Sequence, residues 1–145
     1  MKTNKILIVG DDSPASIKAI QYGFSLASSL GAKVALLTVV DPGLTIGNPD
    51  AGIFPDDALI NVKTKMAEFL TNMKNKYSND VDTKLMLQVG EIQDTVIDIA
   101  LQWEAGIIVT GTHNRTGFSR LFNGSISESI VQHSPVPVLV VPMDK

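Results

Sequence analysis

Short runs of apolar residues alternate with segments of helical periodicity along the whole chain, and this alternation constrains the fold more than any other feature. Five runs predict strands, at residues 6–9, 34–40, 81–89, 106–111 and 136–141. Between them, apolar residues three and four positions apart predict four helices. Strands that alternate with helices form a mostly parallel sheet with helices on both faces. We therefore expect an α/β fold, with residues 1–145 forming a single domain of ordinary size.

The patterns within single strands predict their places in the sheet. Residues 6–9 are uniformly apolar, as in a strand that is buried on both faces, whereas residues 81–89 alternate, as at a half-exposed edge. Pro137 has no N–H to donate to a neighbouring strand, so we expect the last strand at a sheet edge. Residues 138–141 are strongly apolar, and a bare apolar edge favours pairing with another chain. We therefore expect a homodimer through residues 136–141.

Composition excludes several classes of protein. The chain has no cysteine, which excludes disulfide scaffolds, thiolate metal sites and cysteine nucleophiles. Its net charge of −3 gives nucleic acid no electrostatic reason to bind. No stretch reaches the roughly 18 apolar residues of a membrane span, and the start lacks the apolar core of a signal peptide. We therefore expect a cytoplasmic protein with neither nucleic-acid nor membrane partners.

The segment that follows the fourth predicted strand carries the strongest functional signal. In doubly wound sheets, ligands bind beyond the carboxyl ends of the strands, where the strand order reverses. Here Gly111 and Gly124 flank a loop, and Gly124 and Ser125 open the next helix, whose free N–H groups and dipole favour an anion. Both arginines of the chain, Arg115 and Arg120, lie in this loop and are suited to phosphate. This pattern predicts a phosphate site.

A second interpretation of the same segment needs no ligand. Ser125 and Glu128 have the spacing of a capping box, which would satisfy the start of the helix by itself. The residues alone leave phosphate binding and simple capping equally open. Neither the phosphate-binding loop ending in Gly-Lys-Ser/Thr nor Gly-x-Gly-x-x-Gly after the first strand is present, which argues against ordinary nucleotide hydrolases and dinucleotide-binding folds.

At this segment the sequence resembles the universal stress protein family. The hallmark of that family is Gly-x2-Gly-x9-Gly-Ser/Thr after the fourth strand; Gly111, Gly124 and Ser125 match it, and Asn114 replaces the second glycine. The resemblance extends over the full chain. It implies a Rossmann-like sheet of the adenine nucleotide alpha hydrolase type, with strand order 3-2-1-4-5, and a dimer through the last strand.

The resemblance also implies an ATP site. Gly10 and Asp11 would meet the ribose or a Mg²⁺ ion that accompanies ATP, and the backbone of Val39 would meet the adenine. The residues that would hold the phosphates and ribose are Gly111, Asn114, Arg115, Gly124, Ser125, Ile126 and Ser127. Asparagine tolerates left-handed backbone angles, so the loop can form with Asn114, whose side chain would nevertheless lie where phosphate approaches.

The acidic pair Asp11 and Asp12 also fits a phosphoacceptor receiver domain, which shares this topology. That class needs an aspartate at the end of the third strand and a lysine at the end of the fifth, and both are missing. The long turn-rich stretch at residues 41–57 is either a cover for a bound nucleotide or a surface connection.

The function that we expect is a nucleotide-responsive regulatory or stress-response module with a protein partner that the sequence does not identify. Two alternatives stay open: a member that has lost nucleotide binding and works by protein association, and a slow ATPase. No catalytic residue is identified, because neither His113 nor His133 has the partners of a general base. The serines of the 111–127 segment likewise lack a histidine–acid pair.

Overall fold

The computed structural model describes residues 4–42, 55–112 and 126–143. Helices and strands alternate along this part of the chain, as the apolar periodicity predicts. In chain order they are β1 (Lys5–Val9), α1 (Pro14–Leu30), β2 (Lys33–Val40), α2 (Pro55–Tyr77), β3 (Thr83–Val89), α3 (Ile92–Gln102), β4 (Ile107–Gly111), α4 (Ile126–His133) and β5 (Val138–Val141).

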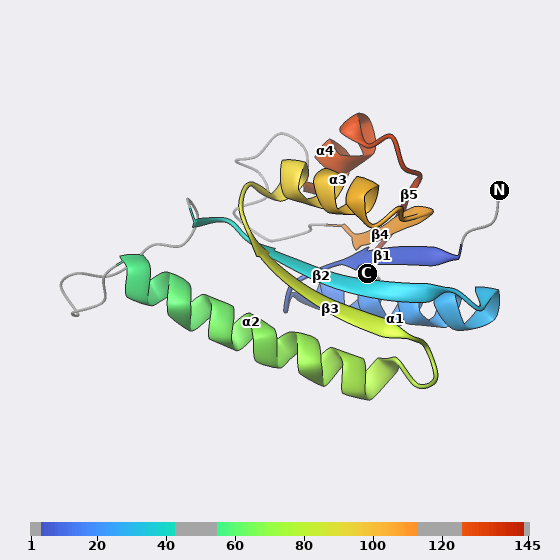
Figure 1. Cartoon of the computed structure of the whole chain (residues 1–145), viewed down its shortest axis with the longest axis horizontal. Coiled ribbons are helices and arrows are strands. Elements are labelled where there is room, and N and C mark those ends of the chain that lie inside the picture. Colours follow the sequence, from blue (N-terminus) through green and yellow to red (C-terminus); the bar gives the residue numbers. More distant parts are fainter. Residues whose placement is uncertain (1–3, 43–54, 113–125, 144–145) are drawn as a thin grey trace.

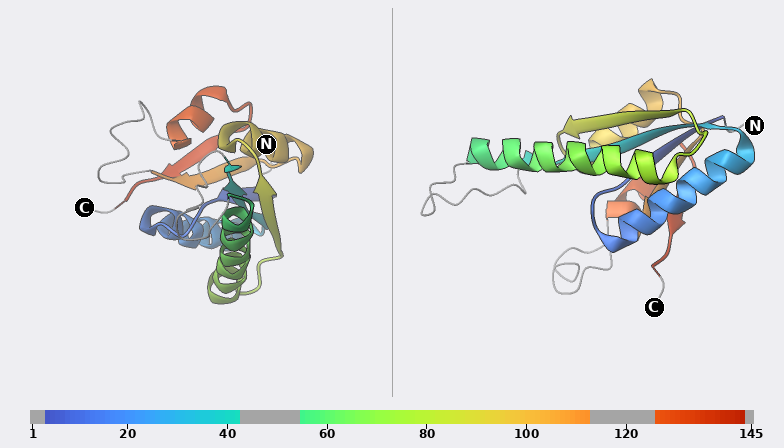
Figure 2. Two further views of the ribbon diagram at one scale, coloured as in Figure 1. Left: turned by 90° about the vertical axis from the view of Figure 1, so that its left-hand side faces the viewer. Right: turned by 90° about the horizontal axis from the view of Figure 1, so that it is seen from below.

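The strands form one parallel sheet in the order β3-β2-β1-β4-β5. Helices α1 and α2 lie along one face of the sheet, and α3 and α4 lie along the other (Figure 1). Figure 2 shows α1 and α2 running beneath the sheet on the same side. The predicted fold class and strand order are thus confirmed, and the strand order reverses between β1 and β4. Among the described helices, none combines the length and the apolarity that crossing a bilayer requires.

Two hydrophobic clusters, one on each face, bury the sheet because β1 sends alternate side chains in opposite directions. Ile6 and Ile8 pack with α1 and α2, and Leu7 and Val9 pack with α3 and α4. All four are at most 7% exposed, which confirms the prediction of a strand buried on both faces. Each fully buried side chain of this kind stabilises the fold by about 1.5–3 kcal/mol.

Helix α1 begins and ends where its sequence signals predict. The Ser13 hydroxyl accepts the backbone N–H of Ser16 at 3.3 Å, and Pro14 occupies the first turn, where its missing N–H costs nothing. At the other end Gly31 has φ of 65°, a left-handed conformation that glycine adopts without steric cost. These two residues fix the length of α1 and hence the point at which the chain re-enters the sheet.

Helix α1 approaches the end of β4 so closely that only glycine fits there. A Cβ atom built on Gly111 would lie 2.6 Å from the carbonyl oxygen of Ala15 and 3.4 Å from the Cβ of Ala19. The first of these contacts is with backbone, which cannot rotate away. Gly111 therefore has a packing reason to be glycine, in addition to the phosphate contact that the resemblance implies.

The edge positions of β3 and β5 are as predicted, but the physical argument from Pro137 needs correction. The last strand begins at Val138, and the carbonyl oxygen of Pro137 accepts the N–H of Ile108 at 2.9 Å. Pro137 therefore directs its backbone toward β4, and its missing N–H does not protect the outer edge. On β5 the alternation of a parallel ladder directs the backbone groups of Val138 and Val140 outward.

Candidate functional site

The carboxyl ends of the parallel strands bring several of the predicted site residues to one edge of the sheet. Gly10 and Asp11 follow β1, Val39 lies near the end of β2, and Gly111 ends β4. Ile126 and Ser127 form the start of α4. Asn114, Arg115, Gly124 and Ser125 lie outside the described residues. The described part of the predicted site therefore lies on β1, β2, β4 and α4, around the point where the strand order reverses.

Strand β2 runs past the end of β1, and this leaves backbone groups of Val39 without a partner on β1. The register between the two strands ends at Val9 and Leu37, and the Gly10 N–H donates to the Leu37 carbonyl oxygen at 3.0 Å. Since backbone direction alternates along a strand, Val39 points to the same side as Leu37. Within the described part of the chain, no residue of β1 lies opposite Val39. Its N–H and C=O can therefore bind a planar ligand.

The tip of β1 is fixed to β2 by a buried side chain. Thr38, which is 2% exposed, donates its hydroxyl hydrogen to the carbonyl oxygen of Gly10 at 2.7 Å. A Cβ on Gly10 would lie 3.2 Å from side-chain atoms of Ser16 and Ile20, which is tight contact. The position of the chain at Gly10 is therefore set by β2 on one side and by α1 on the other.

The two aspartates after β1 have different surroundings. The Asp11 carboxylate accepts the backbone N–H of Ser13 at 2.8 Å, which orients it at the start of α1. The Asp12 carboxylate forms an ion pair of 3.4 Å with Lys65 of α2. The sequence does not predict this ion pair, because nothing in the local pattern of α2 points to the β1 tip.

Magnesium fits this edge only with ligands from outside the described part of the protein. The described residues contain no group of three or more His, Asp or Glu side chains close enough to hold a metal ion. Mg²⁺ prefers octahedral oxygen coordination and usually completes it with water and substrate phosphates. Asp11 could thus contribute one carboxylate to a magnesium ion that arrives with a nucleotide.

The start of α4 is held against α3. Ser127 is 3% exposed, and Ile126 packs against the cluster beneath α3 and α4. One turn further, the Ser129 hydroxyl donates to the side-chain oxygen of Gln93. The His133 ring nitrogen Nδ1 lies 2.8 Å from the Ser129 carbonyl oxygen, so this histidine interacts with the last turn of its own helix.

Glu91, which follows β3, is a capping residue that sequence reasoning did not assign. Its carboxylate accepts the N–H groups of Asp94 at 2.9 Å and Gln93 at 3.1 Å. The hydrogen bond from the Asp94 N–H is the main cause that lowers the pKa of Glu91, and the side-chain hydrogen bond with Glu91 raises the pKa of Asp94. An acidic residue directly after Gly90 and before a helical pattern was the available signal.

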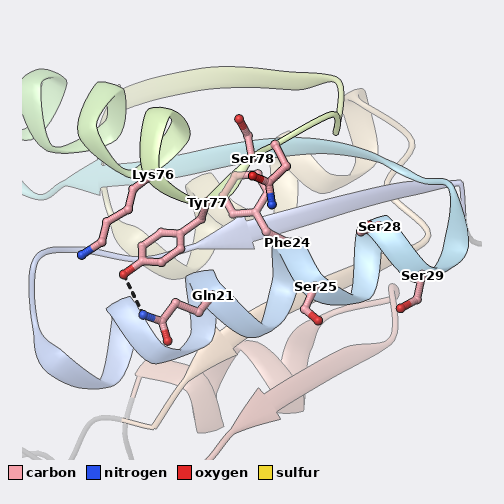
Figure 3. Close-up of a pocket in the computed structure, with 9 residues that line it drawn as sticks. Gln21, Phe24, Ser25, Ser28, Ser29, Lys76, Tyr77 and Ser78 are labelled. Carbon is pink, nitrogen blue, oxygen red and sulfur yellow. Dashed lines mark hydrogen bonds between the residues drawn. The ribbon is translucent and has the colours of Figure 1, made fainter.

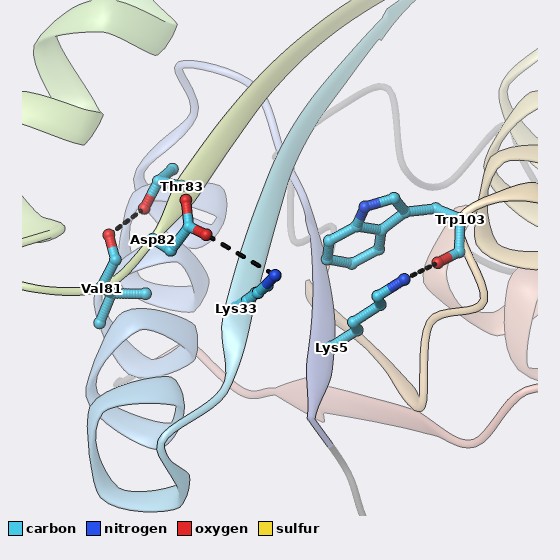
Figure 4. A network of polar contacts seen from close by, with 6 residues as sticks. All are labelled: Lys5, Lys33, Val81, Asp82, Thr83 and Trp103. Atoms are coloured by element: carbon cyan, nitrogen blue, oxygen red, sulfur yellow. Dashed lines mark hydrogen bonds and ion pairs between the residues drawn. The ribbon is translucent and has the colours of Figure 1, made fainter.

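Other polar clusters lie at the opposite end of the sheet. A hollow of about 320 Å³ between the C-terminal ends of α1 and α2 is crossed by a 2.7 Å hydrogen bond from the Gln21 amide to the Tyr77 hydroxyl (Figure 3). At the amino ends of the strands, Lys5 donates to the Trp103 carbonyl oxygen at 3.2 Å, and Lys33 lies 4.0 Å from Asp82 (Figure 4). These contacts join neighbouring elements, and the carboxyl edge stays the candidate site.

Comparison with known proteins identifies the family. A sequence model described as "Universal stress protein family" matches residues 2–142. The universal stress protein MJ0531 of Methanocaldococcus jannaschii is 30% identical, over 97% of this chain and 83% of its own length. The match therefore covers nearly all of this chain.

Solved structures share the fold. The hypothetical protein MJ0577 has a TM-score of 0.83 at 23% identity, covering 100% of this chain and 99% of its own. A universal stress protein in complex with cAMP has a TM-score of 0.75 at 17% identity, with 98% of each chain covered. One from Archaeoglobus fulgidus in complex with dAMP has a TM-score of 0.65 at 17% identity, covering 97% of this chain and 98% of that one. The sequence match, together with this shared architecture, shows that the chain belongs to the universal stress protein family.

Proposed function

We propose that this protein binds an adenine nucleotide, ATP, at the carboxyl edge of its sheet and acts as a cytoplasmic nucleotide-responsive regulatory module. The observation that carries the proposal is the backbone of Val39, whose N–H and C=O have no partner on β1. Adenine presents an acceptor nitrogen beside an amino group, which matches one backbone N–H and one C=O. The complexes of two structural neighbours with cAMP and dAMP support an adenine ligand for this fold.

The proposed contacts to the ribose and the phosphates lie along the sheet from Val39 on β2, first at β1 and then at β4. The ribose and any accompanying Mg²⁺ would lie near Gly10 and Asp11, at the tip of β1. The phosphates would lie between β4 and α4, where the sequence places backbone N–H groups and an arginine. The proposed phosphate ligands are Gly111, Asn114, Arg115, Gly124, Ser125, Ile126 and Ser127.

Calorimetric titration of the purified protein with Mg-ATP tests the proposal. We expect saturable binding of ATP and weaker binding of GTP, because guanine presents a carbonyl oxygen and a ring N–H where adenine presents an amino group and an acceptor. Mass spectrometry of gently purified protein is expected to detect a co-purified adenine nucleotide. Absence of heat at millimolar ATP would exclude the proposed function and favour a role through protein association alone.

We further propose that two copies of this protein pair through β5 to form a homodimer. The outward N–H and C=O groups of Val138 and Val140 can form an antiparallel ladder with a second copy. Exposed apolar side chains occur on α4, the helix that precedes this strand, and directly after the strand: Val131 is 49% exposed, and Met143 is 37% exposed. Pairing would cover an edge that is otherwise open.

Val140→Pro is expected to convert the dimer to a monomer, because it removes an outward N–H from β5 and leaves the ladder with β4 intact. Val89→Pro is the matched control, since Val89 is an outward-facing residue on the opposite edge, on β3. Size-exclusion chromatography with light scattering at tens of micromolar protein measures both. A wild-type monomer, or dimers of both variants, would contradict pairing through β5.

A further inference from the structure

A lysine of α2 reaches the tip of β1 in this structure. Lys65 Nζ lies 3.4 Å from Asp12 Oδ2, in the turn between β1 and α1, and Asp12 directly follows Asp11 of the candidate site. The neighbouring residue Met66 is only 7% exposed, and one turn further along α2 Leu70 is buried in the hydrophobic core, so the backbone at Lys65 is anchored. The position from which the lysine side chain extends is therefore fixed, although the side chain itself is long.

The carboxyl edge of the sheet carries several negative charges. Asp11 and Asp12 follow β1, Asp41 follows β2, and Glu91 follows β3. A nucleotide polyphosphate is itself strongly negative, so these carboxylates oppose its approach. Positive charge at the same edge therefore favours binding. The ammonium group of Lys65 supplies one in addition to the proposed arginine, at the tip of β1, and β1 is the neighbour of β4, beyond which the proposal puts the phosphates.

We propose that Lys65 is a further ligand of the nucleotide phosphates and that Asp12 is the partner from which it transfers when nucleotide binds. This inference rests on the proposed nucleotide function. The Lys65 side chain is 72% exposed and the Asp12 side chain 43% exposed, so both charged groups are in contact with water. Exposed ion pairs contribute little to stability. Lys65 therefore loses little free energy when it exchanges the Asp12 carboxylate for a phosphate.

A purely structural role for the same ion pair makes a different prediction. If the ion pair only holds α2 against the turn after β1, removing Lys65 and removing the Asp12 carboxylate have the same effect on ATP binding. If Lys65 binds phosphate and Asp12 competes for it, removing the lysine weakens ATP binding, whereas removing the carboxylate strengthens it. The signs of the two effects therefore separate the two roles.

The experiment compares Lys65→Ala, Asp12→Asn, the double variant and Lys63→Ala by calorimetry with Mg-ATP and with adenosine at low salt. Lys63 is an exposed lysine two positions away on the same helix, so its variant controls for loss of charge. We expect Lys65→Ala to weaken ATP binding about fivefold, as for a contact between unit charges in water, and to leave adenosine binding unchanged. Asp12→Asn is expected to strengthen ATP binding relative to the wild type. Adding Asp12→Asn to Lys65→Ala is expected to strengthen ATP binding less, because the lysine is no longer there to be released. Lys63→Ala is expected to change the affinity for neither ligand.

Besides an unchanged ATP affinity in Lys65→Ala, three results would overturn the inference: equal losses for ATP and adenosine in Lys65→Ala, weaker ATP binding in both single variants, or an equal loss in Lys63→Ala. Lys65→Gln, which keeps most of the side-chain stem, repeats the test if Lys65→Ala unfolds. A wild-type protein that binds neither ATP nor adenosine would instead exclude the proposed function. Wild-type binding with unchanged affinity in Lys65→Ala would exclude only the role of Lys65.

Discussion

Replacing Gly111 with valine is expected to lower the free energy of unfolding by about 3 kcal/mol, the upper range for overpacking a filled site. The added Cβ would lie 2.6 Å from the Ala15 carbonyl oxygen, so helix α1 would have to move away from β4. That movement would loosen the cluster that includes Ala19 and Val109. Urea denaturation followed by the fluorescence of Trp103, the one tryptophan of the chain, measures the change.

Gly31→Ala is the matched control for this prediction. A Cβ added at Gly31 would meet no atom of a packed neighbour within 4 Å, so that substitution costs only the strain of its left-handed φ of 65°. We expect a loss of about 1 kcal/mol there. If Gly111→Val lowers the free energy of unfolding no more than Gly31→Ala does, α1 can move away from β4 at little cost. Packing would then not require glycine at position 111.

Gly124→Glu is expected to abolish ATP binding and leave the fold stable. The substitution places a carboxylate where the proposal puts phosphate, and juxtaposed like charges cost several kcal/mol. The affinity should therefore fall by more than about a hundredfold. Calorimetry with Mg-ATP measures the loss, and thermal unfolding monitors the fold.

Ser29→Glu is the control for added charge in this experiment, because Ser29 is exposed near the end of α1 that lies at the amino ends of the strands. It is expected to keep the affinity of the wild type. Unchanged ATP affinity in Gly124→Glu would place the phosphates elsewhere. Equal losses in both variants would indicate an effect of net charge alone.

Local patterns predicted the elements of this fold because they depend on neighbours in the sequence. The apolar run of β1, the serine cap of α1 and Gly31 each act within a few residues, and each is found in the predicted role. The alternation in β3 likewise indicated an edge strand. The strand order followed from the family resemblance, since several orders satisfy the same local patterns.

The parts that sequence reasoning missed depend on contacts between distant segments. Asp12 and Lys65 belong to different elements, and their pairing follows from the packing of α2 against α1 and β2. The backbone of Val39 lacks a partner on β1 because β2 runs beyond β1, which no property of Val39 itself encodes. Pro137 was correctly associated with an edge strand, but the direction of its backbone could be known only from the ladder with β4.

The close approach of α1 to Gly111 bears on how relatives of this protein should be compared. In a relative that does not bind a nucleotide, the proposed phosphate ligands Gly124 and Ser125 would be free to change, whereas glycine at the end of β4 would still be needed to accommodate the Ala15 carbonyl. Retention of that first glycine is therefore a signature of shared architecture. Inherited ligand recognition has to be judged from the later positions of the loop.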